Sequence, residues 1–123
     1  MIKTTICLRR KLGTSREAFL EYWHNEHAKL VRELSADLKI ARYVQSHGLD
    51  NEVSAILRHS RGGPEMYDGI GEAWFESLEV LQSLQFDEKA MNAMVRLIED
   101  ERKFIDLARS PFWVCEEHLI ELT

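Results

Sequence analysis

The 123-residue chain has few of the residues that mark whole classes of protein. It contains only two cysteines, Cys7 and Cys115, which lie in separate strand-like segments without the close spacing of a metal site. It also lacks Asn-x-Ser/Thr acceptor sites, internal repeats and low-complexity segments. We therefore expect both thiols to be reduced and buried, as in a cytoplasmic protein.

Long apolar runs are missing as well, and there is no basic cluster beyond Arg9-Arg10-Lys11. No stretch approaches the ~20 apolar residues of a membrane helix, and Arg9-Arg10 stand where a secretion signal would have its cleavage site. The net charge is −5, which argues against nucleic acid or an anionic membrane as partner. No glycine-rich phosphate loop is present, since Arg61-Gly-Gly-Pro64 lacks the lysine and the following helix.

The composition is that of one globular domain spanning residues 1–123. Hydrophobic residues make up 45% and charged residues 30% of the chain, which is ordinary for a soluble protein with its own core. Along the chain, segments whose hydrophobic residues have the spacing typical of strands alternate with segments that have the spacing typical of helices. It predicts strands at 2–9, 40–47, 68–75 and 112–120, a helix at 15–34, a short helix at 77–85, a longer helix at 87–108, and room for a short helix at 51–59.

This order, β-α-β-β-α-β, predicts a ferredoxin-like α+β fold. In that fold both main helices cover one face of a four-stranded antiparallel sheet. Thr14 and Glu17 have the spacing of a capping box at the start of the first helix. In the last helix one face is expected to carry the apolar residues Met91, Met94, Val95, Ile98 and Ile105.

Two histidines of the first helix differ in position. On a helical wheel, His27 falls inside an apolar arc of roughly 120° and His24 just beyond its edge. A titratable ring on a buried face needs a partner or a purpose. A core histidine bonded to a backbone carbonyl is the alternative interpretation. The arc consists of Phe19, Leu20, Trp23, Leu30, Val31 and Leu34.

The predicted strands carry apolar residues on both of their faces. Tyr43, Gln45 and His47 share one side of their strand, while Asp68, Ile70, Glu72 and Trp74 share a side of the next. An uncovered sheet face of this kind predicts a homodimer. Two sheets packed face to face would enclose a cavity for a small hydrophobic ligand.

Five ordered segments resemble the EthD domain family, and the likeness extends from Ile2 to about Ile120. The resemblance implies a dimeric α+β barrel, in a superfamily of isomerases, polyketide cyclases, cofactor-free monooxygenases and haem enzymes. It also implies a pocket formed by the residues matching His27, Tyr43, His47, Asp68 and Trp74. The segments are Ser15-Arg-Glu-Ala-Phe19, Tyr22-Trp-His-Asn-Glu-His27, Arg42-Tyr-Val-Gln-Ser-His47, Tyr67-Asp-Gly-Ile-Gly-Glu-Ala-Trp-Phe75 and Asp100-Glu-Arg-Lys-Phe104.

The resulting hypothesis is a cofactor-independent lyase, isomerase or cyclase that uses general acid–base chemistry on an apolar aromatic or carbonyl-bearing metabolite. His27 and His47 would approach one cavity and move the proton, and Tyr43 would donate to a developing oxyanion. Asp68 would orient a histidine or act as a second base. The expected substrate contacts are Trp23, Trp74, Gln45, Ile70 and Glu72.

Other functions stay open at this point. One is a cofactor-free monooxygenase of phenolic substrates, and another is a non-catalytic binding or accessory protein of a degradation pathway. A metal site is not expected, because Glu21-x-x-His24 has no second copy. The expected cofactor is none, with an axial histidine for haem as the alternative suggested by the resemblance.

Overall fold

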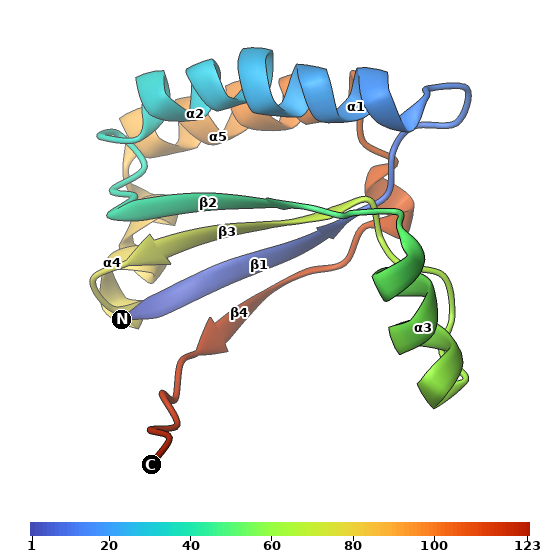
Figure 1. Ribbon diagram of the computed structural model, residues 1–123. Coiled ribbons are helices and arrows are strands. Elements are labelled where there is room, and N and C mark those ends of the chain that lie inside the picture. The colour runs from blue at the N-terminus through green and yellow to red at the C-terminus, as the bar shows by residue number, and fades with distance from the viewer.

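A computed structural model describes all residues 1–123 (Figure 1). Its centre is a four-stranded antiparallel sheet in the order β2-β3-β1-β4. This confirms the predicted ferredoxin-like α+β fold. The strands are β1 (Ile2–Leu8), β2 (Arg42–His47), β3 (Gly69–Phe75) and β4 (Phe112–Glu116).

A layer of helices covers one face of the sheet (Figure 1). It consists of α5 (Glu88–Glu101) beside one long helix made of α1 (Arg16–Tyr22), the π-helical turn η1 (Trp23–His27) and α2 (Ala28–Leu34). Figure 1 shows α3 projecting from the sheet on the side away from these helices. The remaining elements are α3 (Glu52–Arg61), α4 (Leu78–Ser83) and the 3-10 turns η2 (Leu84–Phe86) and η3 (Leu107–Arg109).

The first helix begins one residue later than the predicted capping box. Ser15 has extended backbone angles, and its side chain accepts a hydrogen bond from the Ala18 N–H at 3.1 Å. A short hydroxyl at this position satisfies one of the free N–H groups of the first turn. The prediction that Thr14 and Glu17 form the cap is therefore wrong.

Trp23 sets the spacing between the helical layer and the sheet. Its ring lies so close to β3 that a Cβ atom added to Gly69 would meet it at 2.5 Å and 2.8 Å. A Cβ atom at Gly71 would lie 3.0 Å from Ile6 and 3.5 Å from the same indole. The two glycines of β3 thus permit the close backbone approach that the sequence indicated.

The buried face of α5 differs from the predicted one. Met91, Met94 and Val95 are exposed. The residues of α5 that are buried are Ala90, Ala93, Leu97 and Asp100. The two alanines let α5 lie close to its neighbours, and the larger apolar side chains are left outside. The expected apolar face was therefore wrong for these three residues.

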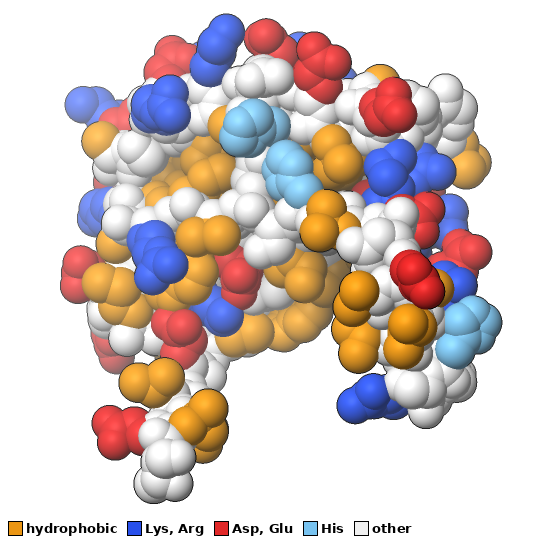
Figure 2. Space-filling model, in the orientation of Figure 1, with side chains coloured by type: hydrophobic (Ala, Val, Ile, Leu, Met, Phe, Trp, Pro, Cys, Tyr) orange, Lys and Arg blue, Asp and Glu red, His pale blue; other side chains and the backbone are white.

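The opposite face of the sheet carries no helical layer. Ile70 and Trp113 are 39% and 47% exposed, and α3 has no buried residue. Figure 2 shows hydrophobic side chains on the sheet between α3 and the C-terminal tail. The apolar, uncovered face that the strand alternation predicted is present. No helix of the chain has the length and apolar character needed to cross a membrane.

Candidate active site

A mostly apolar cavity of about 80 Å³ lies between the helical layer and the sheet. The sequence predicted a cavity between two sheets, and the structure places this one on the other face, within a single protomer. The position follows from the gap that the large Trp23 ring leaves beside it. The hydrophobic side chains at the cavity include Ile6, Leu8, Trp23, Val31, Ile40, Leu97, Ile105 and Phe112.

His27 is the imidazole of this cavity. The π-helical turn η1 carries it, and the side chain is buried. Its Nδ1 lies 2.8 Å from Oδ2 of Asp100. Nε2 makes no hydrogen bond within the chain, and the His27 ring is one of the groups that line the cavity.

Asp100 fixes the orientation of the imidazole. Its Oδ1 accepts a hydrogen bond from the Tyr22 hydroxyl at 2.6 Å. Burial would raise the pKa of Asp100, but hydrogen bonds from Tyr22 and His27 outweigh it, and the pKa is lowered. An ionised carboxylate accepts a hydrogen bond from Nδ1–H, which keeps the ring proton on Nδ1 and leaves the lone pair on Nε2. Burial lowers the pKa of His27 despite the opposing effect of Asp100, so the ring favours its neutral form.

Glu101 supplies a second titratable group to the same cavity. It is the last residue of α5, and its carboxyl group has no hydrogen bond or ion pair within the chain. Burial raises the pKa of Glu101 to about 7, and the neighbouring Asp100 carboxylate adds to this effect. Near neutral pH this carboxyl group can therefore hold a proton that it can give to a ligand.

Tyr43 enters the cavity from β2. Its hydroxyl accepts a hydrogen bond from Nε2 of Gln45 at 3.0 Å, and burial raises the pKa of Tyr43. The phenol therefore keeps its own proton for donation. Gln45 also donates to the Trp23 carbonyl at 2.8 Å, which ties β2 to the π-helical turn.

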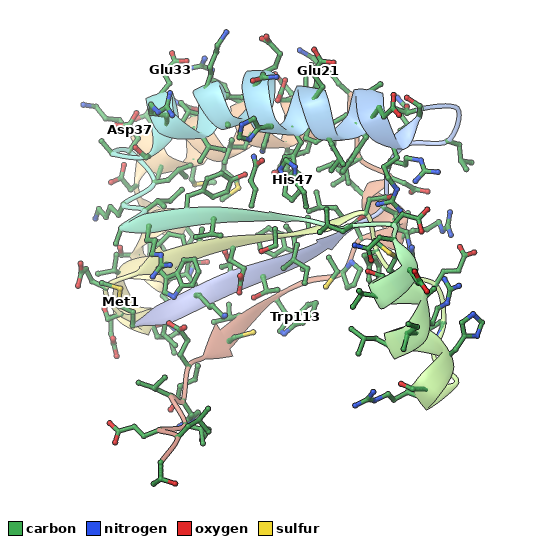
Figure 3. The ribbon with its side chains drawn as sticks, in the orientation of Figure 1. Met1, Glu21, Glu33, Asp37, His47 and Trp113 are labelled. Carbon is green, nitrogen blue, oxygen red and sulfur yellow. The ribbon has the colours of Figure 1, made fainter.

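His47 does not line this cavity. Its ring stacks on Trp23 with centroids 4.8 Å apart, and it lies between β2 and the helical layer (Figure 3). Its Nε2 lies 2.8 Å from Oε1 of Gln45, and His24 approaches it edge-on at 5.5 Å. The structure therefore does not bring His27 and His47 to one cavity, because the Trp23 indole occupies the space beside His47.

Asp68 also lies elsewhere. Its carboxylate pairs with Arg10 at 2.6 Å and with Arg16 at 3.3 Å, and it accepts a hydrogen bond from the Arg10 backbone at 2.8 Å. These contacts join the end of β1 to the start of β3 and to α1. In this structure the side chain stabilises the junction and does not orient a histidine.

Three predicted substrate contacts belong mainly to the other face of the sheet. Since Gly69 and Gly71 face Trp23, alternation turns Ile70 and Trp74 away from the helices. Lys3 and Arg42 place their cations over the Trp74 ring, at 5.3 Å and 4.7 Å from its centroid. Glu72 borders the cavity, but Lys3 pairs with its carboxylate.

Asp100 and Glu101 were not among the site residues expected from the sequence. A signal was present, because they open the Asp100-Glu-Arg-Lys-Phe104 segment of the EthD resemblance. Their placement depends on the buried side of α5, which hydrophobicity alone misassigned. They complete a set in which one oriented imidazole and one carboxyl group of raised pKa face the same apolar space.

Comparisons with known proteins agree with this arrangement of elements. The sequence model of the EthD domain matches residues 11–108. The chain is 32% identical over 111 residues to the conidial pigment biosynthesis dehydratase EthD of Metarhizium robertsii. That alignment covers 86% of this chain and 75% of the fungal protein.

Solved structures share the fold at low sequence identity. An ethyl tert-butyl ether d (EthD) family protein of Bacillus halodurans has a TM-score of 0.62 at 18% identity, covering 96% of this chain and all of the other. A dimeric protein of ferredoxin-like fold from Bacteroides fragilis has a TM-score of 0.58 at 10% identity, covering 94% and 95% of the two chains. An EthD-like protein of Ralstonia eutropha has a TM-score of 0.60 at 16% identity, with coverage of 94% and 89%.

Proposed function

Since this chain belongs to the EthD family, we propose that it is a lyase of the dehydratase type that needs no cofactor. Its substrate class is an apolar, aromatic compound with a hydroxyl group β to a carbonyl. The observation that carries the proposal is the pairing of His27 and Glu101 at one apolar cavity. The dehydratase name of the Metarhizium robertsii relative supports the same reaction class.

In the proposed reaction His27 acts as the base and Glu101 as the acid. Nε2 of His27 takes the proton from the carbon next to the carbonyl, and the C–H electron pair forms the enolate. The enolate then expels the β-hydroxyl group, which receives the proton of Glu101 and leaves as water. A carbon–carbon double bond forms, His27 is left protonated and Glu101 ionised, and transfer of one proton between them restores the starting state.

Tyr43 is suited to the oxyanion of this reaction. It lies at the same cavity, and its raised pKa keeps the phenolic proton in place. A hydrogen bond from the phenol to the carbonyl oxygen would strengthen as that oxygen becomes an enolate. Gln45 would hold the phenol in position, because its amide already donates to the Tyr43 oxygen.

The cavity volume restricts how much of the ligand it encloses. At about 80 Å³ it is smaller than an apolar cavity of roughly 150 Å³ that holds benzene. Tyr43 also lines two surface hollows of about 430 and 310 Å³, bordered by Ala28 and Arg32 of α2. We propose that the reacting end of the substrate lies inside the cavity. The rest of the substrate would extend past Tyr43 into these two surface hollows.

His47 has a different task in this proposal. It carries no carboxylate partner, and burial and the nearby His24 lower its pKa. Its stacking on Trp23 and its bond to Gln45 support the wall of the cavity. We therefore assign His47 as a positioning residue and His27 as the base.

We further propose that the protein is a homodimer joined through the uncovered sheet face. The exposed apolar side chains Ile70 and Trp113 on that face support this assembly. The Bacteroides fragilis structure of the same fold is described as dimeric.

The function is tested with a bicyclic aryl β-hydroxy ketone, whose loss of water creates a conjugated product that absorbs at longer wavelength. His27→Gln should lower kcat/KM by at least about 10²-fold, the usual contribution of a general base. Asp100→Asn should also lower it, because an amide that donates to Nδ1 moves the ring proton onto Nε2. His59→Gln changes an exposed histidine of α3 and is the matched control.

Three outcomes would contradict the proposal. Unchanged turnover in His27→Gln would show that the imidazole is structural. Oxygen uptake that tracks product formation would favour a cofactor-free monooxygenase. Binding of the ketone without turnover would instead favour a non-catalytic ligand-binding protein.

A further inference from the structure

A polar hollow, separate from the cavity and from the two hollows beside Tyr43, lies where the loop after β1 meets α1 and α3. Its volume is about 570 Å³, and its walls are mostly polar. Figure 2 shows basic and acidic side chains gathered above α3, near the start of α1. Six cationic side chains and three carboxylates line the hollow, namely Arg9, Arg10, Lys11, Arg16, Arg58, Arg109, Asp50, Glu65 and Asp68.

This balance of charge is unusual for the chain. The whole protein has a net charge of −5, yet cations outnumber carboxylates two to one around this hollow. Asp68 is shared between Arg10 and Arg16, so one buried carboxylate serves two guanidinium groups. Positive charge therefore remains in excess at this place.

Several of the other cations have no anionic partner. Arg9 donates to the carbonyl oxygens of Met66 and Glu65, which are neutral acceptors. Lys11 likewise donates to the Arg102 carbonyl. Arg109 lies 3.9 Å from its nearest carboxylate, Asp106, at the limit of an ion pair.

Arg58 is the clearest case. It lies on the half-buried side of α3, opposite the exposed residues Val53, Ile56 and Leu57, and it makes no hydrogen bond or ion pair within the chain. It is thus turned toward the main body of the protein. An anion in the hollow would contact α3 and the loop after β1 at the same time.

We propose that this hollow is a binding site for a small phosphate ester, with a charge like that of pyrophosphate. The guanidinium group of an arginine can donate two parallel hydrogen bonds to the oxygens of one phosphate group. Several guanidinium groups around one hollow therefore suit a compact ligand of high negative charge. The volume exceeds that of a lone phosphate, so the organic part of such an ester also has room. The site is independent of the dehydratase cavity.

Titration calorimetry with inorganic pyrophosphate at low ionic strength tests the site. We expect saturable binding that weakens as salt is added. Arg58→Glu should weaken it at least about tenfold, a free-energy change of about 1.4 kcal/mol. Arg61→Glu makes the same charge change on the same helix but outside the hollow, and should change affinity less than about twofold. Hydrogen exchange in α3 should slow when pyrophosphate is bound.

Three results would contradict the proposed phosphate-ester site. Absence of binding at millimolar pyrophosphate would overturn the proposal. An equal loss in Arg58→Glu and Arg61→Glu would reduce it to diffuse attraction. Citrate binding as tightly as pyrophosphate would replace the phosphate ester with a polycarboxylate. None of these results bears on the dehydratase, whose assay uses other residues.

Discussion

Single residues define the ionisation states that the proposed chemistry requires. His27 must be neutral to accept a proton, and burial lowers its pKa below the ordinary 6.5. Glu101 must be protonated to donate, and its pKa is about 7. The kcat/KM profile should therefore rise with pH through the lowered pKa of His27 and fall as pH passes about 7. Initial rates of dehydration measured from acid to alkaline buffer check this expectation.

The alkaline limb of that profile has a specific origin. In Glu101→Gln it should disappear together with most of the activity, because the amide cannot supply a proton. A fall near pH 7 that persists in Glu101→Gln would assign the limb to another group.

Glu101 also makes stability depend on pH. The native state keeps this proton up to a pH of about 7, whereas the unfolded chain releases it near 4.5. Between these values the unfolded state binds fewer protons, so the free energy of unfolding falls as pH rises and stays low above pH 7. Glu101→Gln should raise it by about 2–3 kcal/mol near pH 8 and hardly change it near pH 4.

Urea unfolding at both pH values measures this difference. Glu99→Gln is the matched control, since it changes an exposed glutamate of the same helix. Equal stabilisation at the two pH values would show that the Glu101 carboxyl group is not held in its neutral form.

At the scale of elements, the contact of Trp23 with β3 determines where the cavity lies. Gly69→Ala would place a methyl group within 2.5 Å of the indole and 2.9 Å of the Ser46 carbonyl. Such overpacking should cost about 1–3 kcal/mol of stability. Gly63→Ala is the control, because its nearest neighbour would lie 3.9 Å away. Thermal unfolding of both variants provides the comparison, and equal melting temperatures would contradict the role of Gly69.

The elements themselves were largely predictable from the sequence. Strand alternation and the helical arc correctly placed the sheet, the long first helix and the buried His27. The cavity was not predictable, because its position depends on the distance that Trp23 and Gly69 set between two layers. The buried side of α5 was missed because Ala90 and Ala93 are weaker hydrophobic signals than Met91 and Met94. Because that side of α5 was missed, Asp100, the partner of His27, and Glu101, the proposed acid, were missed as well.

At the scale of the whole molecule, the uncovered sheet face leads to the last prediction. Trp113 lies on the side of the sheet away from the helices (Figure 3). It is 47% exposed in the single chain, and Ile70, on the same face of the sheet, is 39% exposed. A large aromatic side chain of this kind is the usual centre of an interface. We expect a dimer at micromolar concentration by sedimentation velocity.

Trp113→Glu should dissociate that dimer, because a carboxylate buried between two sheets would lack a partner. The loss in affinity should be at least about tenfold. Met91→Glu is the matched control, since Met91 is about equally exposed but lies on α5, on the other side of the molecule. It should leave the dimer intact. A wild-type protein that sediments as a monomer would contradict this assembly, while the cavity, which one protomer encloses by itself, would remain a candidate active site.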